Sequence, residues 1–167
     1  MDKKIKIWLF LFLCSVQFSF AQSYVAGLNK QANQMVNCFK TGDYACLLSF
    51  THPKIVKAMG GSKLAEEKLA QQMTNMKQQG AEFSKIAVEP VLQHLVSGKT
   101  IQCVVPQIVE VKYLGQVVKS KTYLFGISYN NGKNWYFIDA GSQSPEKIRQ
   151  FLPEISKKIV IPKKERS

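Results

Sequence analysis

The apolar residues of this chain change their spacing once, near residue 80, and this change constrains the fold more than any other feature of the sequence. Before it, apolar positions recur every three or four residues, as in amphipathic helices. After it, β-branched and aromatic residues fill alternating runs, as in strands. The predicted helices cover 24–39, 44–50 and 62–79. The predicted strands cover 83–88, 91–96, 100–113, 117–129 and 135–139.

Helices that precede a run of strands predict an α+β fold, with three N-terminal helices packed on a curved, mainly antiparallel sheet. Turn signals separate the elements. Asp43 is a good N-cap for the second helix, and Ser62 for the third. His52-Pro53 ends the second helix, because the residue before proline avoids helical geometry. Ser144-Pro145-Glu146 starts a short C-terminal helix, with proline at its first position.

Residues 1–21 have the layout of a secretory signal peptide. Three lysines form a basic start, and 5–13 is almost purely apolar. Ser19-Phe20-Ala21 then places small residues at the two positions that a signal peptidase reads. The apolar run is shorter than the roughly 20 residues of a spanning helix. We therefore expect cleavage before Gln22 and an exported protein, in the periplasm or the medium, with no stable membrane insertion after cleavage.

Beyond the leader, we expect one α+β domain over 22–152 and a basic, mobile tail over 153–167. The whole chain carries a formal net charge of +12 at pH 7. Such a balance suits nucleic acid, anionic lipid or acidic polysaccharide, or it simply keeps a secreted domain soluble. Export argues against nucleic acid as the partner.

Three cysteines follow the leader, and an odd number in an exported protein indicates one pair with a spare thiol, or no pair. Cys38 and Cys46 flank the turn at 40–43, so their side chains could meet across a helix hairpin, and we expect a disulfide there. Cys103 lies in an apolar strand, where a free cysteine packs as a small hydrophobe. The two histidines are far from these cysteines in the sequence, so we expect no metal site, and no motif indicates a cofactor.

Four segments, together with the order of the elements, carry a family resemblance. They are Gly42-Asp43-Tyr44, His52-Pro53, Gly60-Gly61 and Gly132-Lys133-Asn134-Trp135-Tyr136-Phe137-Ile138-Asp139. With them, residues 24–142 resemble the nuclear transport factor 2-like superfamily, whose relatives include polyketide cyclases and ketosteroid isomerases. The resemblance implies a cone-shaped α+β fold with an apolar pocket. It implies no single activity, because members include enzymes, binding proteins and dimerisation modules, and no catalytic motif of the family matches here.

Two polar residues interrupt the apolar faces of predicted strands. Gln107 lies on the apolar face of 100–113, so it either brings a polar group into a pocket or repairs the backbone beside Pro106, which has no N–H to donate. Asp139 is in phase with the aromatic residues that precede it. Its carboxylate would be a general base if it were buried, or else a cap for the turn at 140–142.

Other candidates are ordinary residue types in suggestive places. His52 could be a general base, or it could only close a helix before proline. The hydroxyl groups of Tyr44 and Tyr123 could reach a pocket, although tyrosine is also a common core residue with a wet end. The predicted ligand-binding residues are Gln107, Tyr44, Tyr123, Trp135 and Phe137.

These observations favour an exported, non-enzymatic domain with an apolar pocket for a small ligand or a protein partner. One alternative is a cofactor-free isomerase, cyclase or hydratase that uses Asp139 or His52. Another is a module that dimerises through an exposed sheet face. A polar cone with a buried acid would favour the enzyme, and a cone packed shut with Phe, Leu and Met would favour the dimer.

Overall fold

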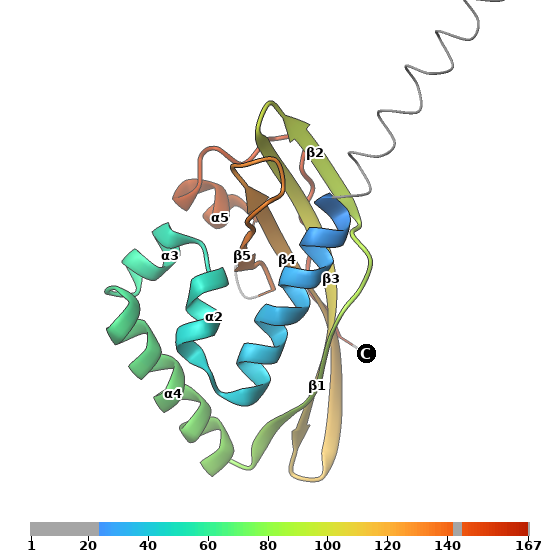
Figure 1. The fold of residues 1–167 in the computed structure, drawn as a ribbon. Coiled ribbons are helices and arrows are strands. Elements are labelled where there is room, and N and C mark those ends of the chain that lie inside the picture. The colour runs from blue at the N-terminus through green and yellow to red at the C-terminus, as the bar shows by residue number, and fades with distance from the viewer. Residues whose placement is uncertain (1–23, 142–144, 167) are drawn as a thin grey trace, which may run out of the picture.

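The computed structural model describes residues 24–141 and 145–166. In these ranges the helices precede an antiparallel sheet, which confirms the predicted α+β class (Figure 1). The first helix is described over 24–41. The other helices are α2 (Tyr44–Phe50), α3 (Pro53–Ala58), α4 (Ser62–Gln78) and α5 (Pro145–Phe151). The strands are β1 (Ala81–Val88), β2 (Gln93–Ser97), β3 (Thr100–Tyr113), β4 (Gln116–Ser128), β5 (Tyr136–Asp139) and β6 (Glu165–Arg166).

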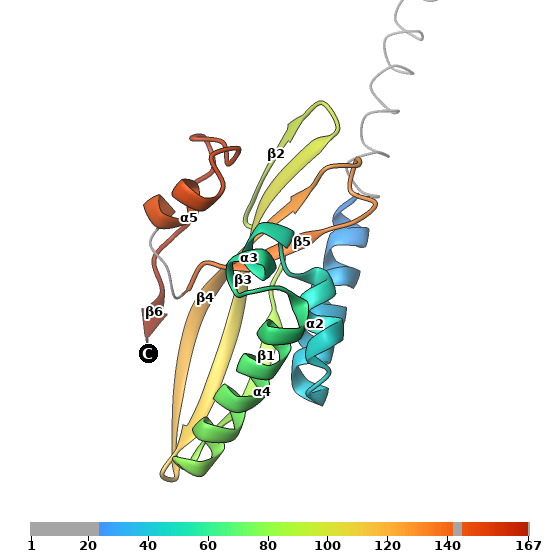
Figure 2. The same ribbon diagram turned by 90° about the vertical axis from the view of Figure 1, so that its left-hand side faces the viewer.

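A long hairpin of β3 and β4 forms the middle of the sheet. Its register runs from Ile101 opposite Ser128 to Tyr113 opposite Gln116. β1 and β2 pair with the outer edge of β3, and β5 and β6 pair with the outer edge of β4. The sheet curls into a half-barrel with a concave and a convex face (Figures 1 and 2). Each face therefore receives alternate residues of every strand.

The first helix covers the base of the concave face. Leu28, Ala32 and Val36 recur at every fourth position, which places them on one side of the helix. That side packs on Trp135 and Phe137 and on alternate residues of the hairpin. The buried residues of this core are Tyr24, Leu28, Ala32, Met35, Val36, Ile86, Ile101, Cys103, Val105, Leu124, Trp135 and Phe137.

The C-terminal segment packs on the convex face, on the other side of the sheet from the helices (Figure 2). Ile155, Ile159 and Ile161 are buried there, and β6 continues the sheet beside β4. The core on this face consists of Val104, Tyr123, Phe125, Ile127, Ile138, Ala140, Ile148, Leu152, Ile155, Ile159 and Ile161. This packing differs from the mobile tail expected over 153–167, because three isoleucines of that segment bury against the sheet.

Two glutamines of the sheet hold this segment in place. The side-chain amide of Gln102 donates to the carbonyl of Glu154 at 2.8 Å, and its oxygen accepts from the backbone N–H of Ser156 at 2.9 Å. Gln93 makes the same pair of bonds, at 3.1 and 2.9 Å, to the backbone of 158–160. A side-chain amide presents the same donor and acceptor as a peptide unit. The segment is therefore bonded to the sheet almost as a strand would be.

Two helix starts differ from the prediction. Residues 53–58 form a separate helix, α3, with His52 as its N-cap, between the helices predicted over 44–50 and 62–79. α4 begins at Ser62 itself, and its N-cap is Gly61, which makes no side-chain capping bond. Ser62 is therefore a helical residue rather than the cap. Among the helices in the described ranges, none has the length and apolar character that a membrane span needs.

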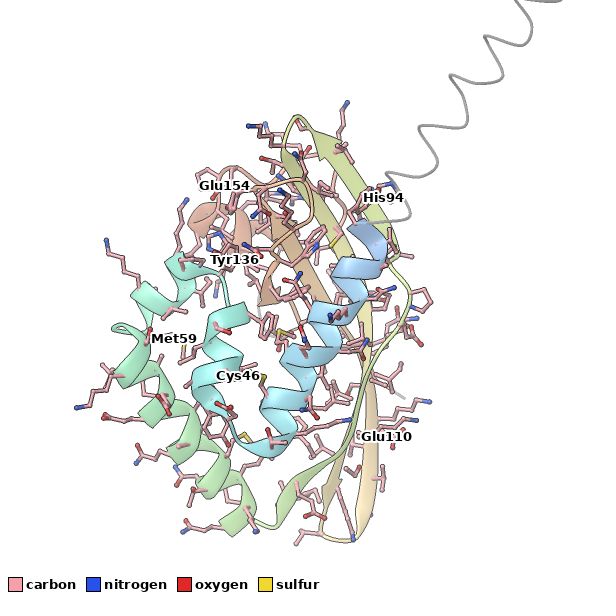
Figure 3. The ribbon with its side chains drawn as sticks, viewed as in Figure 1. Cys46, Met59, His94, Glu110, Tyr136 and Glu154 are labelled. Atoms are coloured by element: carbon pink, nitrogen blue, oxygen red, sulfur yellow. A yellow bond between two sulfur atoms is a disulfide. The ribbon has the colours of Figure 1, made fainter. Side chains whose placement is uncertain are left out.

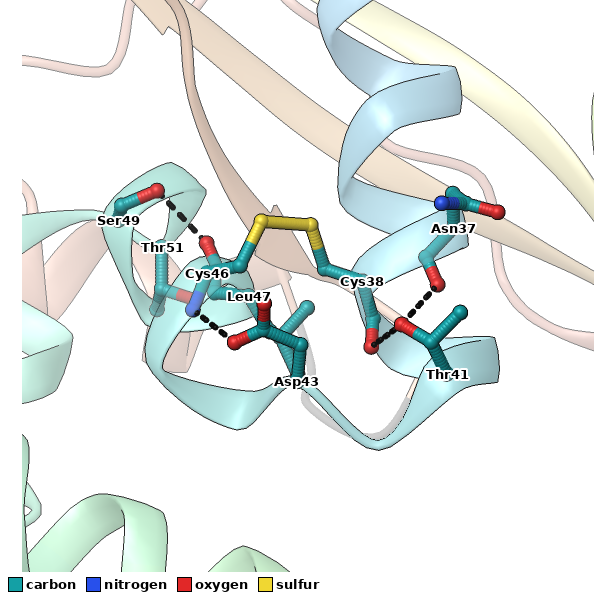
Figure 4. Close-up of a disulfide and its surroundings, with 8 residues drawn as sticks. All are labelled: Asn37, Cys38, Thr41, Asp43, Cys46, Leu47, Ser49 and Thr51. Atoms are coloured by element: carbon teal, nitrogen blue, oxygen red, sulfur yellow. Dashed lines mark hydrogen bonds between the residues drawn. A yellow bond between two sulfur atoms is a disulfide. The ribbon is translucent and has the colours of Figure 1, made fainter.

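A disulfide joins the first helix to α2 across their tight connection (Figure 4). The Sγ atoms of Cys38 and Cys46 lie 1.97 Å apart. Asp43 is the N-cap of α2, as predicted, and its Oδ1 accepts from the backbone N–H of Cys46 at 2.9 Å. Thr41 donates to the carbonyl of Asn37 at 3.0 Å at the end of the first helix. Cys103 is free and buried.

Candidate functional site

Cross-strand pairing orders the concave face into rows that change in character along the hairpin. From the free end of the hairpin inward, these rows are Phe83 with Val111 and Val118; Ile86 with Val109 and Ser120; Val88 with Gln107 and Thr122; and Val105 with Leu124 and Asp139. The outermost row is apolar and partly exposed. The middle rows include buried polar side chains, and the innermost rows merge with the core under the first helix.

The outer part of the concave face is left open by the helices. In Figure 1 the hairpin extends well beyond the end of the first helix. Phe83 is 37% exposed and Val118 is 45% exposed, while Val111 between them is half-buried. Tyr113, one row further out, is also exposed. We refer to Phe83, Val111, Tyr113 and Val118 as the open patch.

A hollow of about 200 Å³ borders the open patch. It lies between the end of the first helix, the last turns of α4 and the start of β1. The rings of Phe39 and Phe83 meet edge to face in its wall, with centroids 5.0 Å apart. Met73 and Met76 of α4 are half-buried and face it from the other side. The lining residues are Phe39, Met73, Met76, Lys77, Ala81, Glu82 and Phe83.

A buried row with polar side chains lies two rows inward from the open patch. Gln107 and Thr122 face each other across β3 and β4, and both are buried. The Oγ1 atom of Thr122 has no hydrogen-bond partner among the described residues. Gln107 lies opposite Val88 of β1 on its other side, in the same row of the concave face.

Asp139 ends β5 beside these residues. Its Oδ1 accepts from the backbone N–H of Gly141 at 2.8 Å, so the carboxylate caps the turn. Although the residue as a whole is exposed, partial desolvation raises the pKa of the carboxyl, while the Gly141 bond and the charge of Lys164 oppose the shift. A Cβ on Gly141 would lie 2.9 Å from the Cβ of Thr122 and 3.0 Å from Asp139 Oδ1. Glycine therefore lets the chain pass closely over both side chains.

His52 lies in a different cluster and uses both ring nitrogens. Nδ1 accepts from the backbone N–H of Lys54 at 3.2 Å, and Nε2 lies 2.9 Å from the Tyr129 hydroxyl. Because Nδ1 is an acceptor, Nε2 carries the proton and donates to Tyr129. Tyr129 in turn donates to Glu154 at 3.2 Å, and Lys54 completes the circuit with an ion pair to Glu154 at 3.0 Å. His52 thus connects α3, the end of β4 and the C-terminal segment.

Burial favours the uncharged forms of His52 and Tyr129 at the centre of this cluster. Burial lowers the pKa of His52 below 6.5, against the charge of Glu154 and with that of Lys54. Burial and the neighbouring Glu154 raise the pKa of Tyr129 to about 12. The His52 ring meets Tyr129 and Tyr136 edge to face (Tyr136 and Glu154 are labelled in Figure 3). A substrate could use His52 as a base only by breaking one of its two bonds.

The structure does not bring the five predicted ligand-binding residues together. Trp135 and Phe137 lie within the core under the first helix, where the Trp135 Nε1 donates to the Gly132 carbonyl at 3.0 Å. Tyr123 points to the convex face and donates to Glu165 at 3.0 Å. Tyr44 is half-buried on α2. Gln107 lies on the same face as the open patch, two rows inward from Val111.

Sequence reasoning missed the residue that completes the polar row. The face of β4 that carries Thr122 also holds Ser120 and Ser128 beside Val118 and Leu124, so Thr122 does not stand out in the sequence as Gln107 does on β3. The sequence does not show that Met73 and Met76 of α4 face a hollow, because that depends on where the helix lies relative to β1.

A second, more open groove of about 510 Å³ runs beside the disulfide, between the first helix and α2. It is lined by Lys30, Asn33, Gln34, Asn37, Cys38, Cys46 and Phe50. No titratable cluster lies in it. Across the described ranges, no group of three His, Cys, Asp or Glu side chains is placed to hold a metal ion.

Comparison of the chain with protein-family models, with curated proteins and with solved structures finds no match.

Proposed function

We propose that this chain is an exported, non-enzymatic domain of the nuclear transport factor 2-like kind, which binds an apolar ligand on the open patch and in the adjoining hollow. The observation that carries the proposal is the exposed apolar row of Phe83, Val111 and Val118 on a face that is otherwise covered. Apolar side chains grouped around a hollow mark a binding surface, whereas single exposed ones do not. The leader at 1–21 supports export.

The composition of the hollow suits an apolar ligand of variable shape. Met73 and Met76 have flexible thioether side chains that adapt to irregular partners, and the rings of Phe39 and Phe83 offer flat apolar walls. Each square ångström of apolar surface that a ligand removes from water stabilises the complex by about 25 cal/mol. Lys77 and Glu82 lie at the rim, where their charges can remain in water.

The acid–base candidates argue against catalysis. Both nitrogens of His52 are bonded within the fold, and the Asp139 carboxylate caps the turn at Gly141. Neither residue belongs to the open patch or lines the hollow. A general base must reach the proton that it removes, so these residues fit a structural role.

The size of the open patch favours a small ligand over a second copy of the chain. A stable interface takes about 20–30 residues from each partner, whereas this patch and its hollow involve far fewer. The neighbouring convex surface is charged, with Lys85 paired to Glu110 at 3.8 Å and Lys121 to Glu89 at 3.0 Å. Beyond the exposed Leu114 and Val117 at the tip of the hairpin, an apolar dimer interface would therefore meet charged surface.

Adjacent valines of β4 give a matched test. Val118 belongs to the open patch and is 45% exposed, while Val117 points to the convex face and is 58% exposed. We expect the uncharged aromatic probe N-phenyl-1-naphthylamine to fluoresce on binding wild-type protein. Val118→Asp should weaken binding at least about tenfold, since it puts a carboxylate in the apolar site, and Val117→Asp should leave it unchanged.

Light scattering and unfolding curves on the same variants separate the alternatives. Equal loss of probe binding in both variants, or no binding by wild type, would overturn the proposal. A wild-type dimer that Val118→Asp turns into a monomer would show that the patch is an interface between copies.

A further inference from the structure

We propose that residues 113–117, the tip of the β3–β4 hairpin, insert reversibly into the surface of a membrane that contains anionic phospholipid. We refer to these residues as the hairpin tip. The proposal does not rest on the proposed function, because Leu114 and Val117 belong neither to the open patch nor to the hollow beside it. Contact of this kind is peripheral and needs no membrane-spanning helix.

Apolar side chains are concentrated at the hairpin tip. Leu114 is 74% exposed, which is the largest value among the large apolar side chains of the described residues, and Val117 and Tyr113 are exposed beside it. In both ribbon views the hairpin projects past the first helix and ends at one extremity of the molecule (Figures 1 and 2). The tip therefore presents these side chains at a convex point rather than in a groove.

The turn at the tip holds a leucine where its backbone favours another residue. Leu114 and Gly115 both have positive φ, at 48° and 81°, in the two-residue turn that joins β3 to β4. Such turns favour Asn-Gly, because both residues adopt the left-handed region readily. Asn131 and Gly132 are that pair in another turn of this chain, with φ of 58° and 79°. A leucine that is both unfavourable in the turn and exposed to water indicates a role outside the fold.

Exposed lysines surround the hairpin tip. Lys112 and Lys119 flank it on the two strands, and Lys77 lies in the last turn of α4. The end of α4 is close to the tip, since a Cβ on Gly80 would lie 3.6 Å from Leu114 Cδ2. None of the three lysines forms an ion pair within the described ranges.

The charge at this end of the molecule is positive on balance. Glu82 lies opposite Lys112 in the register of β1 and β3 and offsets one of the three lysines, while Glu110 is already paired with Lys85. The hairpin tip itself contains no acidic residue, and the whole chain carries a formal charge of +12. Lysines held near a bilayer are attracted to anionic head groups. Charge complementarity therefore favours an anionic membrane surface as the partner.

The spacing of these residues matches the depth of an interfacial insertion. Lys112 is two residues from Leu114, which is about 7 Å along the strand. Apolar faces of interfacial segments bury about 5–10 Å into the boundary between head groups and acyl chains. With Leu114 at that boundary, the lysines lie near the phosphates. A protein partner fits less well, because a stable interface takes about 20–30 residues from each side and the tip projects only a few.

Co-sedimentation with vesicles of phosphatidylglycerol and phosphatidylcholine in equal parts tests the proposal on the exported form of the protein. Leu114→Asn removes the apolar side chain and suits the turn, so its melting temperature should equal or exceed that of wild type. Its binding should be at least about tenfold weaker. Leu92→Asn, at an exposed leucine whose N–H bonds to Val104 at the other end of β3, should bind like wild type.

A second pair of variants tests the role of charge. Lys112→Gln combined with Lys119→Gln should weaken binding to the mixed vesicles about tenfold or more. Lys57→Gln combined with Lys63→Gln removes the same charge from α3 and from the start of α4, and should have a much smaller effect. Wild type should bind vesicles of phosphatidylcholine alone more weakly than the mixed vesicles.

Several outcomes would overturn the proposal. They are no binding of wild type to the mixed vesicles, equal binding by Leu114→Asn and Leu92→Asn, and equal weakening by the two pairs of lysine variants. A lower melting temperature of Leu114→Asn would assign the leucine to the fold instead of a membrane. Binding of N-phenyl-1-naphthylamine is a separate measurement, so failure of the apolar site and failure of the membrane contact are distinguishable.

Discussion

Single polar side chains hold distant segments of this protein together. His52 joins α3 to Tyr129 and, through it, to Glu154 of the C-terminal segment. The side-chain amides of Gln93 and Gln102, on the sheet, donate to backbone carbonyls of the same segment. Each of these residues has its polar atoms satisfied, which buried groups require. Thr122 is the contrast, because its buried hydroxyl has no partner in the described part of the chain.

Replacing His52 by Ala should lower the free energy of unfolding by about 1–3 kcal/mol, since the N-cap of α3 and the donor to Tyr129 are both lost. The pKa of folded His52 lies below 6.5, so the unfolded chain takes up a proton first as the pH falls. The contribution is thus complete above pH 6.5 and is lost as the pH drops toward the folded-state pKa.

Urea unfolding at about pH 7.5 and about pH 5.5 measures this dependence. Wild type should lose more stability between the two pH values than His52→Ala. His94→Ala replaces an exposed histidine and should behave like wild type. A pH dependence that is identical in all three proteins would contradict the role assigned to His52.

At the scale of elements, helix packing explains both the covered and the open parts of the concave face. The first helix packs along the base of the sheet, whereas Ala65 is the one buried residue of α4, which lies against α2, α3 and β1. α4 therefore leaves Met73 and Met76 half-buried beside β1 instead of sealing the hairpin. The disulfide ties the first helix to α2 and so limits how far this helical layer can shift.

The helix hairpin and the leader can be checked together in protein purified from its native host. Denatured, unreduced protein treated with an alkylating agent should show an N-terminus at Gln22 and one modified cysteine, Cys103, by mass spectrometry. Replacing Cys38 and Cys46 by Ser should destabilise the fold by about 2.5 kcal/mol on the chain-entropy model. Three modified cysteines would refute the pairing, and a Met1 start or a lipid on Cys14 would refute cleavage at this site.

On the scale of the whole molecule, the sheet has a core on each face, and the two cores come from opposite ends of the chain. The N-terminal helices cover the concave side, and α5 with the segment after it covers the convex side. Both layers are needed, because strands buried on two faces expose apolar surface when either layer is lost.

Truncation measures what the C-terminal layer contributes. A chain ending at residue 152 loses Ile155, Ile159 and Ile161, which are buried in the convex core. At about 1.5–3 kcal/mol for each side chain, the loss approaches the whole stability of a typical domain. We expect this chain to be largely unfolded by circular dichroism, and a chain ending at 162 to remain folded. A folded chain with a wild-type melting temperature after truncation at 152 would support a separate, mobile tail.

The sequence by itself determined the class and order of the elements. Apolar spacing is a local property, so it predicts β3 over Thr100–Tyr113 with the bounds observed, and Asp43 as the cap of α2. It also marked Gln107 as a polar residue on an apolar face. Tertiary structure alone decided what covers each face. The isoleucines after residue 153 follow no helical or strand period, and glutamine side chains on β2 and β3 hold their backbone against the sheet. The open patch likewise depends on where the first helix ends relative to the hairpin, and no local pattern records that distance.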